Sequence, residues 1–225
     1  FEQTIADGGF RGAKVYLTFA PPYIPADEIR IFDFIPPHQL DVLARRGWVL
    51  MLHIPRPGRL GDEVDLAQLV EMDRRWPDLP VIVAHVGRAY CIENVGGAFE
   101  VLGATNLRFD ISANTNEEVF RRLLDAVGPG RVLFGTDLPI LRMRTRRVCE
   151  DGVYVNLVPK GLYGDVSSDP HLREVTGPEA ASLTFFLYEE IAAFRRAAEA
   201  AGLSEADVRA VFHDNARAML DAAGR

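Results

Sequence analysis

The sequence predicts an α/β fold built on a parallel sheet. Short apolar runs rich in β-branched residues recur through the first 139 residues, and a segment with helical spacing of apolar side chains follows them. The repeat is about 30 residues long, the usual size of a strand-helix-strand unit. His53 and His85, which occupy equivalent places in two repeats, are 32 residues apart. Strands joined by such helical crossovers lie parallel in one sheet.

Five segments are predicted as strands because each is short, apolar and bounded by turn residues. They are Ala13–Phe19, Trp48–Ile54, Pro80–Val86, Leu107–Ser112 and Arg131–Gly135. The second, WVLMLHI, is apolar almost throughout, which is typical of a strand buried on both faces. The set therefore favours a sheet that is covered on both sides.

The segments between these strands carry helix signals. The predicted helices are Pro37–Arg46, Asp65–Trp76, Glu93–Leu102 and Glu117–Val127, and two more, Pro178–Ala201 and Ser204–Leu220, end the chain. Pro37 stands in a first turn, where proline is favoured, and Ser204 with Asp207 resembles a capping box. Residues 141–177 have no clear period and are predicted as a long loop insertion within a single domain, 1–225.

Composition and charge exclude several classes of protein. The chain has 225 residues, of which 48% are hydrophobic and 25% charged, so it is an ordinary globular sequence and not a disordered or fibrous one. Its net charge of -7 argues against a nucleic-acid surface, and no apolar run is long enough to predict a membrane span. Cys91 and Cys149 are expected to be free thiols in a reducing, cytoplasmic compartment. We expect a small-molecule substrate as the partner.

Three polar residues end apolar strands. His53 and His85 close the second and third predicted strands, and Asp137 follows the fifth. The carboxyl ends of parallel strands form the ligand-binding edge of a barrel or open sheet, so these side chains are expected to converge there. Two imidazoles and a carboxylate suit a divalent transition metal such as zinc. Such a metal would acidify bound water and polarise a carbonyl group.

Other polar residues leave alternatives open. Arg88 follows His85 closely and could bind a substrate carboxylate or make a surface ion pair. Lys14 lies early in its strand, where a carbamylated lysine bridging two metals is a minor alternative. Asp110 could face the barrel interior or a neighbouring strand. His213 in the last helix is expected to be structural.

The sequence resembles the amidohydrolase-2 group of metal-dependent TIM-barrel enzymes. The matching segments are Gly9–Tyr16, Val49–His53, Leu79–Gly87, Asn106–Ser112, Gly130–Pro139 and Asp214–Leu220. In that family the histidine ending the fifth barrel strand, here His53, binds metal. The histidine ending the sixth, here His85, binds metal or acts as acid and base beside it. The aspartate after the eighth, here Asp137, binds metal and transfers a proton.

The resemblance also identifies what this sequence lacks. The family's first strand ends in a His-x-His or similar pair, and no His-x-His occurs here. The first predicted strand corresponds to the family's fourth, so we expect an incomplete (β/α)8 TIM barrel that covers strands four to eight and the C-terminal helices. Three missing units would need roughly 90 residues, at ~30 per unit, and we interpret the chain as a fragment.

The resemblance implies a metal-dependent hydrolase that acts on a small amide, lactone or ester through water on a zinc ion, with manganese as the second choice of metal. Asp137 and His85 would be the catalytic residues and Arg88 a substrate-binding residue. A metal-dependent decarboxylase of an aromatic or unsaturated carboxylic acid is the alternative reaction. A non-catalytic binding subunit without the first-strand ligands is the alternative class, and a homodimer is plausible for the family.

Overall fold

Five short strands form the central sheet of the protein. The computed structural model describes residues 1–224. The strands are β1 (Gly12–Val15), β2 (Val49–Leu52), β3 (Val81–Val83), β4 (Arg108–Asp110) and β5 (Val132–Leu133). They pair in chain order and every pair is parallel. The predicted α/β class with a parallel sheet is therefore confirmed. Within residues 1–224, β1 and β5 do not pair with each other, so the sheet is open.

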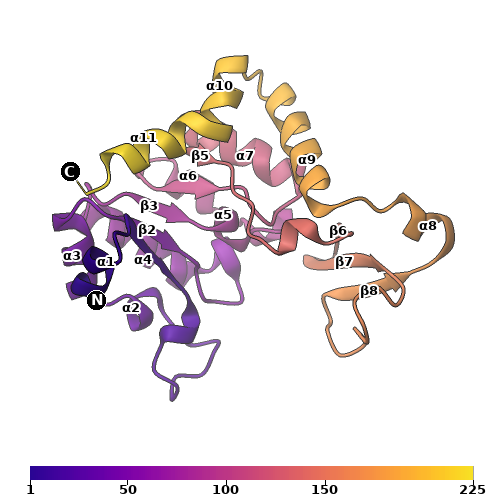
Figure 1. The fold of residues 1–225 in the computed structure, drawn as a ribbon, viewed down its shortest axis with the longest axis horizontal. Coiled ribbons are helices and arrows are strands. Elements are labelled where there is room, and N and C mark those ends of the chain that lie inside the picture. The colour runs from indigo at the N-terminus through magenta and orange to yellow at the C-terminus, as the bar shows by residue number, and fades with distance from the viewer. Residues whose placement is uncertain (225) are drawn as a thin grey trace.

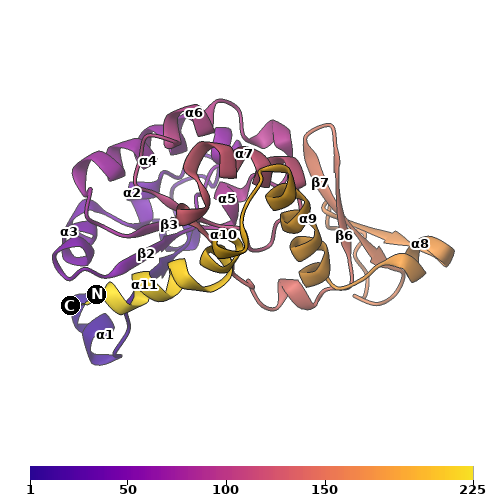
Figure 2. The ribbon, with the colours of Figure 1, turned by 90° about the horizontal axis from the view of Figure 1, so that it is seen from above.

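Helices cover both faces of this sheet (Figures 1 and 2). The longer helices on the outer face are α3 (Pro37–Arg45), α4 (Glu63–Arg75), α6 (Ala98–Leu102) and α7 (Glu117–Val127). Alternate strand residues such as Leu50, Leu52 and Phe109 pack into the main hydrophobic core on that side. Figure 2 shows α11 (Asn215–Ala222) on the opposite, inner face. There Met219 packs against Val49 and its neighbours from β3 and β5.

The remaining helices frame the sheet. They are α1 (Glu2–Asp7), α2 (Ile31–Phe34), α5 (His85–Arg88), α8 (Gly177–Ser182), α9 (Phe186–Ala200) and α10 (Glu205–Arg209). A π-helical turn, Ala210–Asp214, joins α10 to α11. Helix α7 has the predicted bounds because Asn116 caps the amide of Val119 and Gly128, at φ 70°, ends the helix. Predicted helix 93–102 is shorter in the structure, since Gly96 takes a positive φ of 52° before α6 begins.

The segment 141–177 is not a structureless loop, which corrects the prediction. It holds a second sheet of three strands, β6 (Arg146–Glu150), β7 (Val153–Pro159) and β8 (Leu172–Val175). Strands β6 and β7 form a hairpin around Asp151 and Gly152, which both have positive φ. Asp-Gly is a strong signal for this two-residue turn. Figure 1 shows the small sheet projecting from one end of the central sheet, beside α8.

The predicted helix 178–201 is interrupted. Residues 183–185 are extended between α8 and α9, because the backbone there pairs with residues 143–145. The amide of Thr145 donates to the carbonyl of Thr184, and the amide of Phe186 donates to the carbonyl of Met143. A continuous helix through residues 183–185 would leave the amide of Thr145 and the carbonyl of Met143 without these partners. The pairing therefore ends α8.

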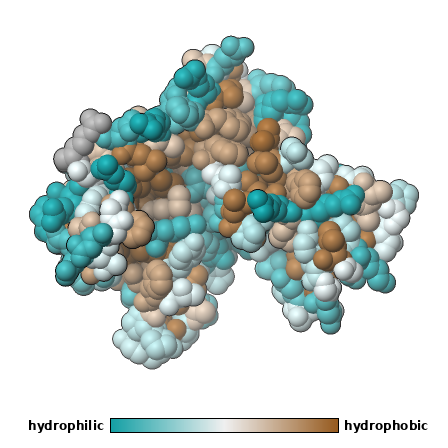
Figure 3. Space-filling model, viewed as in Figure 1, coloured by the Kyte–Doolittle hydropathy of each residue, from teal (hydrophilic) through white to brown (hydrophobic). Residues whose placement is uncertain are grey.

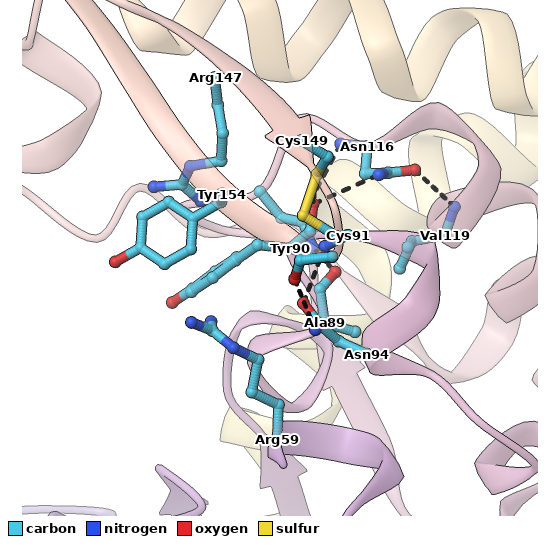
Figure 4. Close-up of a disulfide and its surroundings, with 12 residues drawn as sticks. Arg59, Ala89, Tyr90, Cys91, Asn94, Asn116, Val119, Arg147, Cys149 and Tyr154 are labelled. Atoms are coloured by element: carbon cyan, nitrogen blue, oxygen red, sulfur yellow. Dashed lines mark hydrogen bonds between the residues drawn. A yellow bond between two sulfur atoms is a disulfide. The ribbon is translucent and has the colours of Figure 1, made fainter. Parts of the chain in front are cut away.

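A disulfide joins Cys91, after β3, to Cys149 in β6 (Figure 4). The prediction of two free thiols is therefore wrong. The residues are 58 positions apart in the sequence, and the hairpin brings the second beside the first. Disulfides persist mainly in oxidising compartments, so the thiol argument no longer supports a cytoplasmic location. Among residues 1–224, no helix is long and apolar enough to cross a membrane.

Candidate active site

The three predicted site residues lie at the same edge of the sheet. His53 directly follows β2, and its amide donates to the carbonyl of Val15 at the end of β1. His85 follows β3, and the centroids of its ring and the His53 ring are 5.5 Å apart. The His85 Nε2 atom is 3.9 Å from Asp137 Oδ2. The structure therefore brings the three side chains to one place, although no three His, Cys, Asp or Glu residues within 1–224 are grouped closely enough to form a ready metal site.

His53 is neutral in this environment. Burial, and then the positive charges of Arg88, His85 and Lys14, lowers the pKa of His53 from 6.5 to about 3. Its Nδ1 atom is buried and has no hydrogen-bond partner among the described residues. A neutral imidazole with an unused nitrogen is the form in which histidine binds a metal.

Hydrogen bonds determine which nitrogen of His85 carries its proton. His85 Nδ1 lies 3.2 Å from the carbonyl oxygen of Ser112 and 2.9 Å from Ser112 Oγ. The carbonyl only accepts, and the Ser112 hydroxyl already donates to Asp110 Oδ1. The proton of neutral His85 is therefore on Nδ1, and the Nε2 lone pair faces Asp137. In this tautomer Nε2 accepts a proton or binds a metal, and it donates a hydrogen bond only when the ring is doubly protonated.

Asp110 positions His85 through hydrogen bonds. The sequence left its direction open, and the structure places it on the inner face, because Phe109 and Ile111 on either side of it enter the outer core. Its Oδ1 also accepts the backbone amides of His85 and Ser112, at 3.2 Å and 3.0 Å. One carboxylate thus positions both the backbone and the ring of His85. An aspartate inside an otherwise apolar strand is the sequence signal for this role.

The backbone that presents His85 is left-handed. His85, Val86, Gly87 and Arg88 all have φ between 49° and 60°. The left-handed conformation costs about 1–2 kcal/mol for each residue with a side chain. Only Gly87 adopts it freely, so surrounding contacts must hold the turn.

Arg88 supplies several of these contacts. Its Nη1 donates to the carbonyl oxygens of Ile54, Pro55 and Arg56, at 3.3, 3.0 and 3.3 Å. The guanidinium therefore links the turn after β3 to the segment that follows His53. The substrate-binding role predicted for Arg88 stays a prediction. The Nε and Nη2 groups of Arg88 make no hydrogen bond with the described residues, so these groups would bind the substrate.

Replacing Arg88 by glutamine is expected to lower the free energy of unfolding by about 1–3 kcal/mol, because the turn and three carbonyl groups lose a charged donor. Urea unfolding measures the change. Arg74→Gln is the control, since Arg74 is exposed and its guanidinium makes no hydrogen bond in the described structure, and it should change stability by less than about 0.5 kcal/mol. Equal stability of the two variants would show that Arg88 does not hold the turn.

Asp137 lies between His85 and Lys14. Its Oδ1 is 3.8 Å from Lys14 Nζ, and its backbone has a positive φ of 40°. Burial favours the neutral amine of Lys14, but the Tyr16 hydroxyl and the carboxylates of Asp137 and Asp110 outweigh it and raise the pKa. Lys14 therefore stays cationic and balances Asp137. Carbamylation needs the neutral amine, so this environment does not favour the minor alternative of a metal-bridging lysine.

A cavity of about 380 Å³ opens beside these residues on the inner face of the sheet. Its polar wall contains Lys14, His85, Asp110, Ser112 and Asp137. Its apolar wall is formed by Val49, Met51, Ile82, Leu133, Met219 and Leu220, with other small residues of β1 and α11. In Figure 3, apolar surface gathers in the hollow below the C-terminal helices. The cavity suits a small, partly apolar substrate.

A family model described as amidohydrolase matches residues 1–222. The chain belongs to the amidohydrolase family. The resemblance expected from the sequence motifs is thereby confirmed. A comparison of this amidohydrolase with curated proteins finds no match.

Solved structures share the fold of this amidohydrolase at low sequence identity. An amidohydrolase from Burkholderia multivorans, with bound HEPES, is 15% identical with a TM-score of 0.60, over 97% of this chain and 68% of that one. A second crystal form contains zinc, with a TM-score of 0.59 over 97% and 69% of the two chains at 15% identity. The 4-oxalomesaconate hydratase from Rhodopseudomonas palustris is 17% identical, with a TM-score of 0.56 over 98% and 58%.

An uncharacterised TIM-barrel protein from Bordetella bronchiseptica is 14% identical, with a TM-score of 0.51 over 99% of this chain and 61% of that one. These likenesses show the fold. The five parallel strands of this amidohydrolase are thus part of a TIM-barrel architecture, as the sequence predicted.

Two further residues of this amidohydrolase were missed by the sequence analysis. Glu190 of α9 is fully buried, and neither of its carboxyl oxygens has a partner among the described residues. Arg147 of β6 packs on aromatic rings next to the site. Both come from segments remote from the strand ends, and no local pattern marks them. The remaining candidate, His213, is exposed, and its Nδ1 lies 2.7 Å from Asp214 Oδ1; the structural role expected of it stays a prediction.

Proposed function

We propose that this amidohydrolase is a metal-dependent hydrolase that adds water to the carbonyl of a small amide, lactone or ester. The observation that carries the proposal is the 3.9 Å approach of His85 Nε2, an unprotonated nitrogen, to Asp137 in the wall of the inner cavity. A basic nitrogen and a carboxylate at one point of an apolar cavity form a site for moving protons at a bound carbonyl.

His53, His85 and Asp137 are the residues that would hold the metal. The donor set fits zinc in kind, because it offers two neutral imidazoles and one carboxylate. The unpartnered Nδ1 atom of buried His53 supports the assignment, and the Burkholderia multivorans relative contains zinc. When bound, the metal supplies Lewis-acid polarisation of the carbonyl and a more acidic water.

The protein's own groups then have separate tasks. Asp137 accepts the proton of the attacking water and returns it to the leaving group. His85 has two alternative roles at Nε2: it binds the metal when neutral, or, when doubly protonated beside the metal, it donates to the carbonyl oxygen as negative charge develops there. In both roles Asp110 and Ser112 keep its ring oriented. Lys14 remains a cation beside Asp137 and favours the ionised carboxylate.

Metal analysis tests the proposal without a substrate. Protein purified in a buffer that contains zinc should hold about one zinc ion per chain. His53→Ala and Asp137→Ala should each weaken zinc binding by about 10-fold or more, because each removes a ligand. His213→Ala, which removes an exposed histidine outside the site, is the control and should keep the wild-type zinc content. Unchanged zinc in both site variants would remove the proposed metal centre.

The same protein separates the alternatives when it is incubated with a panel of esters, lactones, amides and carboxylic acids. Hydrolysis products support the proposal. Release of CO2 from an acid without hydrolysis would assign the decarboxylase instead. A chain without metal and without turnover would indicate the non-catalytic binding subunit.

A further inference from the structure

A second cavity of about 290 Å³ adjoins the site on the side of the small sheet. Asp137 lies in the walls of both cavities, so the second is next to the proposed reaction centre. The other wall is built from the insertion, the segment after β3 and the start of α9, by Tyr90, Arg147, Tyr154, Asn156, His171 and Phe186. The hairpin segment thus contributes directly to the surroundings of Asp137.

The guanidinium of Arg147 is the main polar group of this cavity. Its Cζ atom lies 4.3, 4.6 and 4.9 Å from the ring centroids of Tyr90, Tyr154 and Phe186. Its Nε donates to Asn156 at 2.9 Å, and Nη1 donates to the carbonyl of Ala113. Nη2 makes no hydrogen bond with the described residues. The rings therefore fix the plane of the guanidinium and leave one edge available.

The positive charge at this place is not neutralised by the protein. Within residues 1–224, no carboxylate oxygen lies within 4.0 Å of the Arg147 guanidinium. A second guanidinium, that of Arg59, lies 4.9 Å from the centroids of both Tyr90 and Tyr154, and it also has no ion pair among the described residues. Figure 4 shows both guanidinium groups beside the two tyrosines, next to the disulfide.

The neighbouring acids do not offset this charge. Glu190 is buried, and burial with the nearby charge of Asp110 raises its pKa to about 9, so it is neutral at pH 7. Asp137 is paired with Lys14. Asp169, also in the wall, is exposed, and its Oδ1 accepts the backbone amide of His171. A cation held between aromatic rings away from acidic partners is a site for an anion.

We propose that this second cavity binds a carboxylate group of the substrate, and that Arg147 is the residue that selects for it. The rings of Tyr90, Tyr154 and Phe186 hold the guanidinium in place, so that its free edge is directed at the bound carboxylate. The inference rests on the proposed function in treating the ligand as the substrate of the adjacent site. The disulfide supports the geometry, since Cys91 follows Tyr90 and Cys149 lies on the same side of β6 as Arg147.

Titration calorimetry with benzoate and its neutral isostere benzamide tests this inference. Wild-type protein should bind benzoate at least about 10-fold more tightly than benzamide, because only the carboxylate pairs with a guanidinium. Arg147→Gln should weaken benzoate binding by about 10- to 100-fold and leave benzamide binding within about 2-fold. Arg146→Gln is the matched control, since it removes the same charge from the opposite side of the same strand, and it should bind benzoate as wild type does.

Two results would overturn the inference. One is equal binding of benzoate and benzamide by the wild type, which needs no variant and is independent of folding defects. The other is an equal loss of benzoate binding in Arg147→Gln and Arg146→Gln, which would indicate a general effect of charge. Binding is measured without turnover, so an inactive or metal-free protein would refute the proposed function while this test could still succeed.

Discussion

The Asp137→Asn variant is expected to lose about 10²- to 10⁴-fold in kcat toward whichever ester, lactone or amide the protein hydrolyses. The amide has the size of the carboxylate but cannot accept the proton of the attacking water. It also cannot balance Lys14, whose Nζ is 3.8 Å from Asp137 Oδ1. Steady-state kinetics on the wild type and the variant measure the change.

Asp27→Asn controls for the loss of one negative charge. Asp27 is exposed and lines neither cavity, so its variant should keep the wild-type kcat. A thermal melt of Asp137→Asn establishes that the variant is folded. Retention of more than about one tenth of the wild-type kcat by a folded Asp137→Asn protein would exclude Asp137 as the proton-transfer group.

Replacing Glu190 by glutamine is expected to stabilise the protein at alkaline pH. Burial raises the pKa of Glu190 from 4.5 to about 9 in the folded state. Between these two values the folded chain holds a proton that the unfolded chain has lost, so the free energy of unfolding falls as pH rises, by about 1.4 kcal/mol per pH unit. This contribution is fully present below pH 4.5 and is lost as pH rises toward 9. Glutamine has no such proton to lose.

The gain in the free energy of unfolding of Glu190→Gln over the wild type should therefore be roughly 4 kcal/mol larger at pH 8 than at pH 5. Urea unfolding at both pH values measures this gain. Glu189→Gln is the matched control on the same helix. Glu189 is partly exposed, and its carboxylate makes no hydrogen bond in the described structure, so its variant should differ from wild type by less than about 0.5 kcal/mol at either pH. An advantage of Glu190→Gln that is the same at pH 5 and pH 8 would contradict the assigned pKa.

The elements that sequence reasoning predicted well are those in which the signal is local. Helix α7 was predicted to the residue, because its cap, its apolar stripe and its terminal glycine are all within 13 residues. The five strands were located but are shorter than predicted, since the ends of the apolar runs turn away from the sheet. The convergence of His53, His85 and Asp137 followed from strand order, because parallel strands joined by helices place equivalent residues at one edge.

The errors came from contacts between distant segments or from a missed turn signal. The hairpin around Asp151 and Gly152 had a readable signal in its Asp-Gly pair, but the surrounding residues lack the simple alternation of a half-buried strand. The break before α9 arises because residues 143–145 compete for the backbone groups of 184–186. The free-thiol prediction failed because the hairpin brings Cys149 against Cys91 across 58 positions.

The sequence by itself determined the α/β class, the strand order and the edge at which the histidines and Asp137 meet. These depend on periodicity, turn residues and chain connectivity, which act over short stretches. The tertiary structure alone decided the proton position on His85, the neutral state of Glu190 and the unpaired charge of Arg147. Those properties depend on burial and on partners supplied by remote segments, and a carboxylate or guanidinium has the same residue letter in water as in a buried cavity.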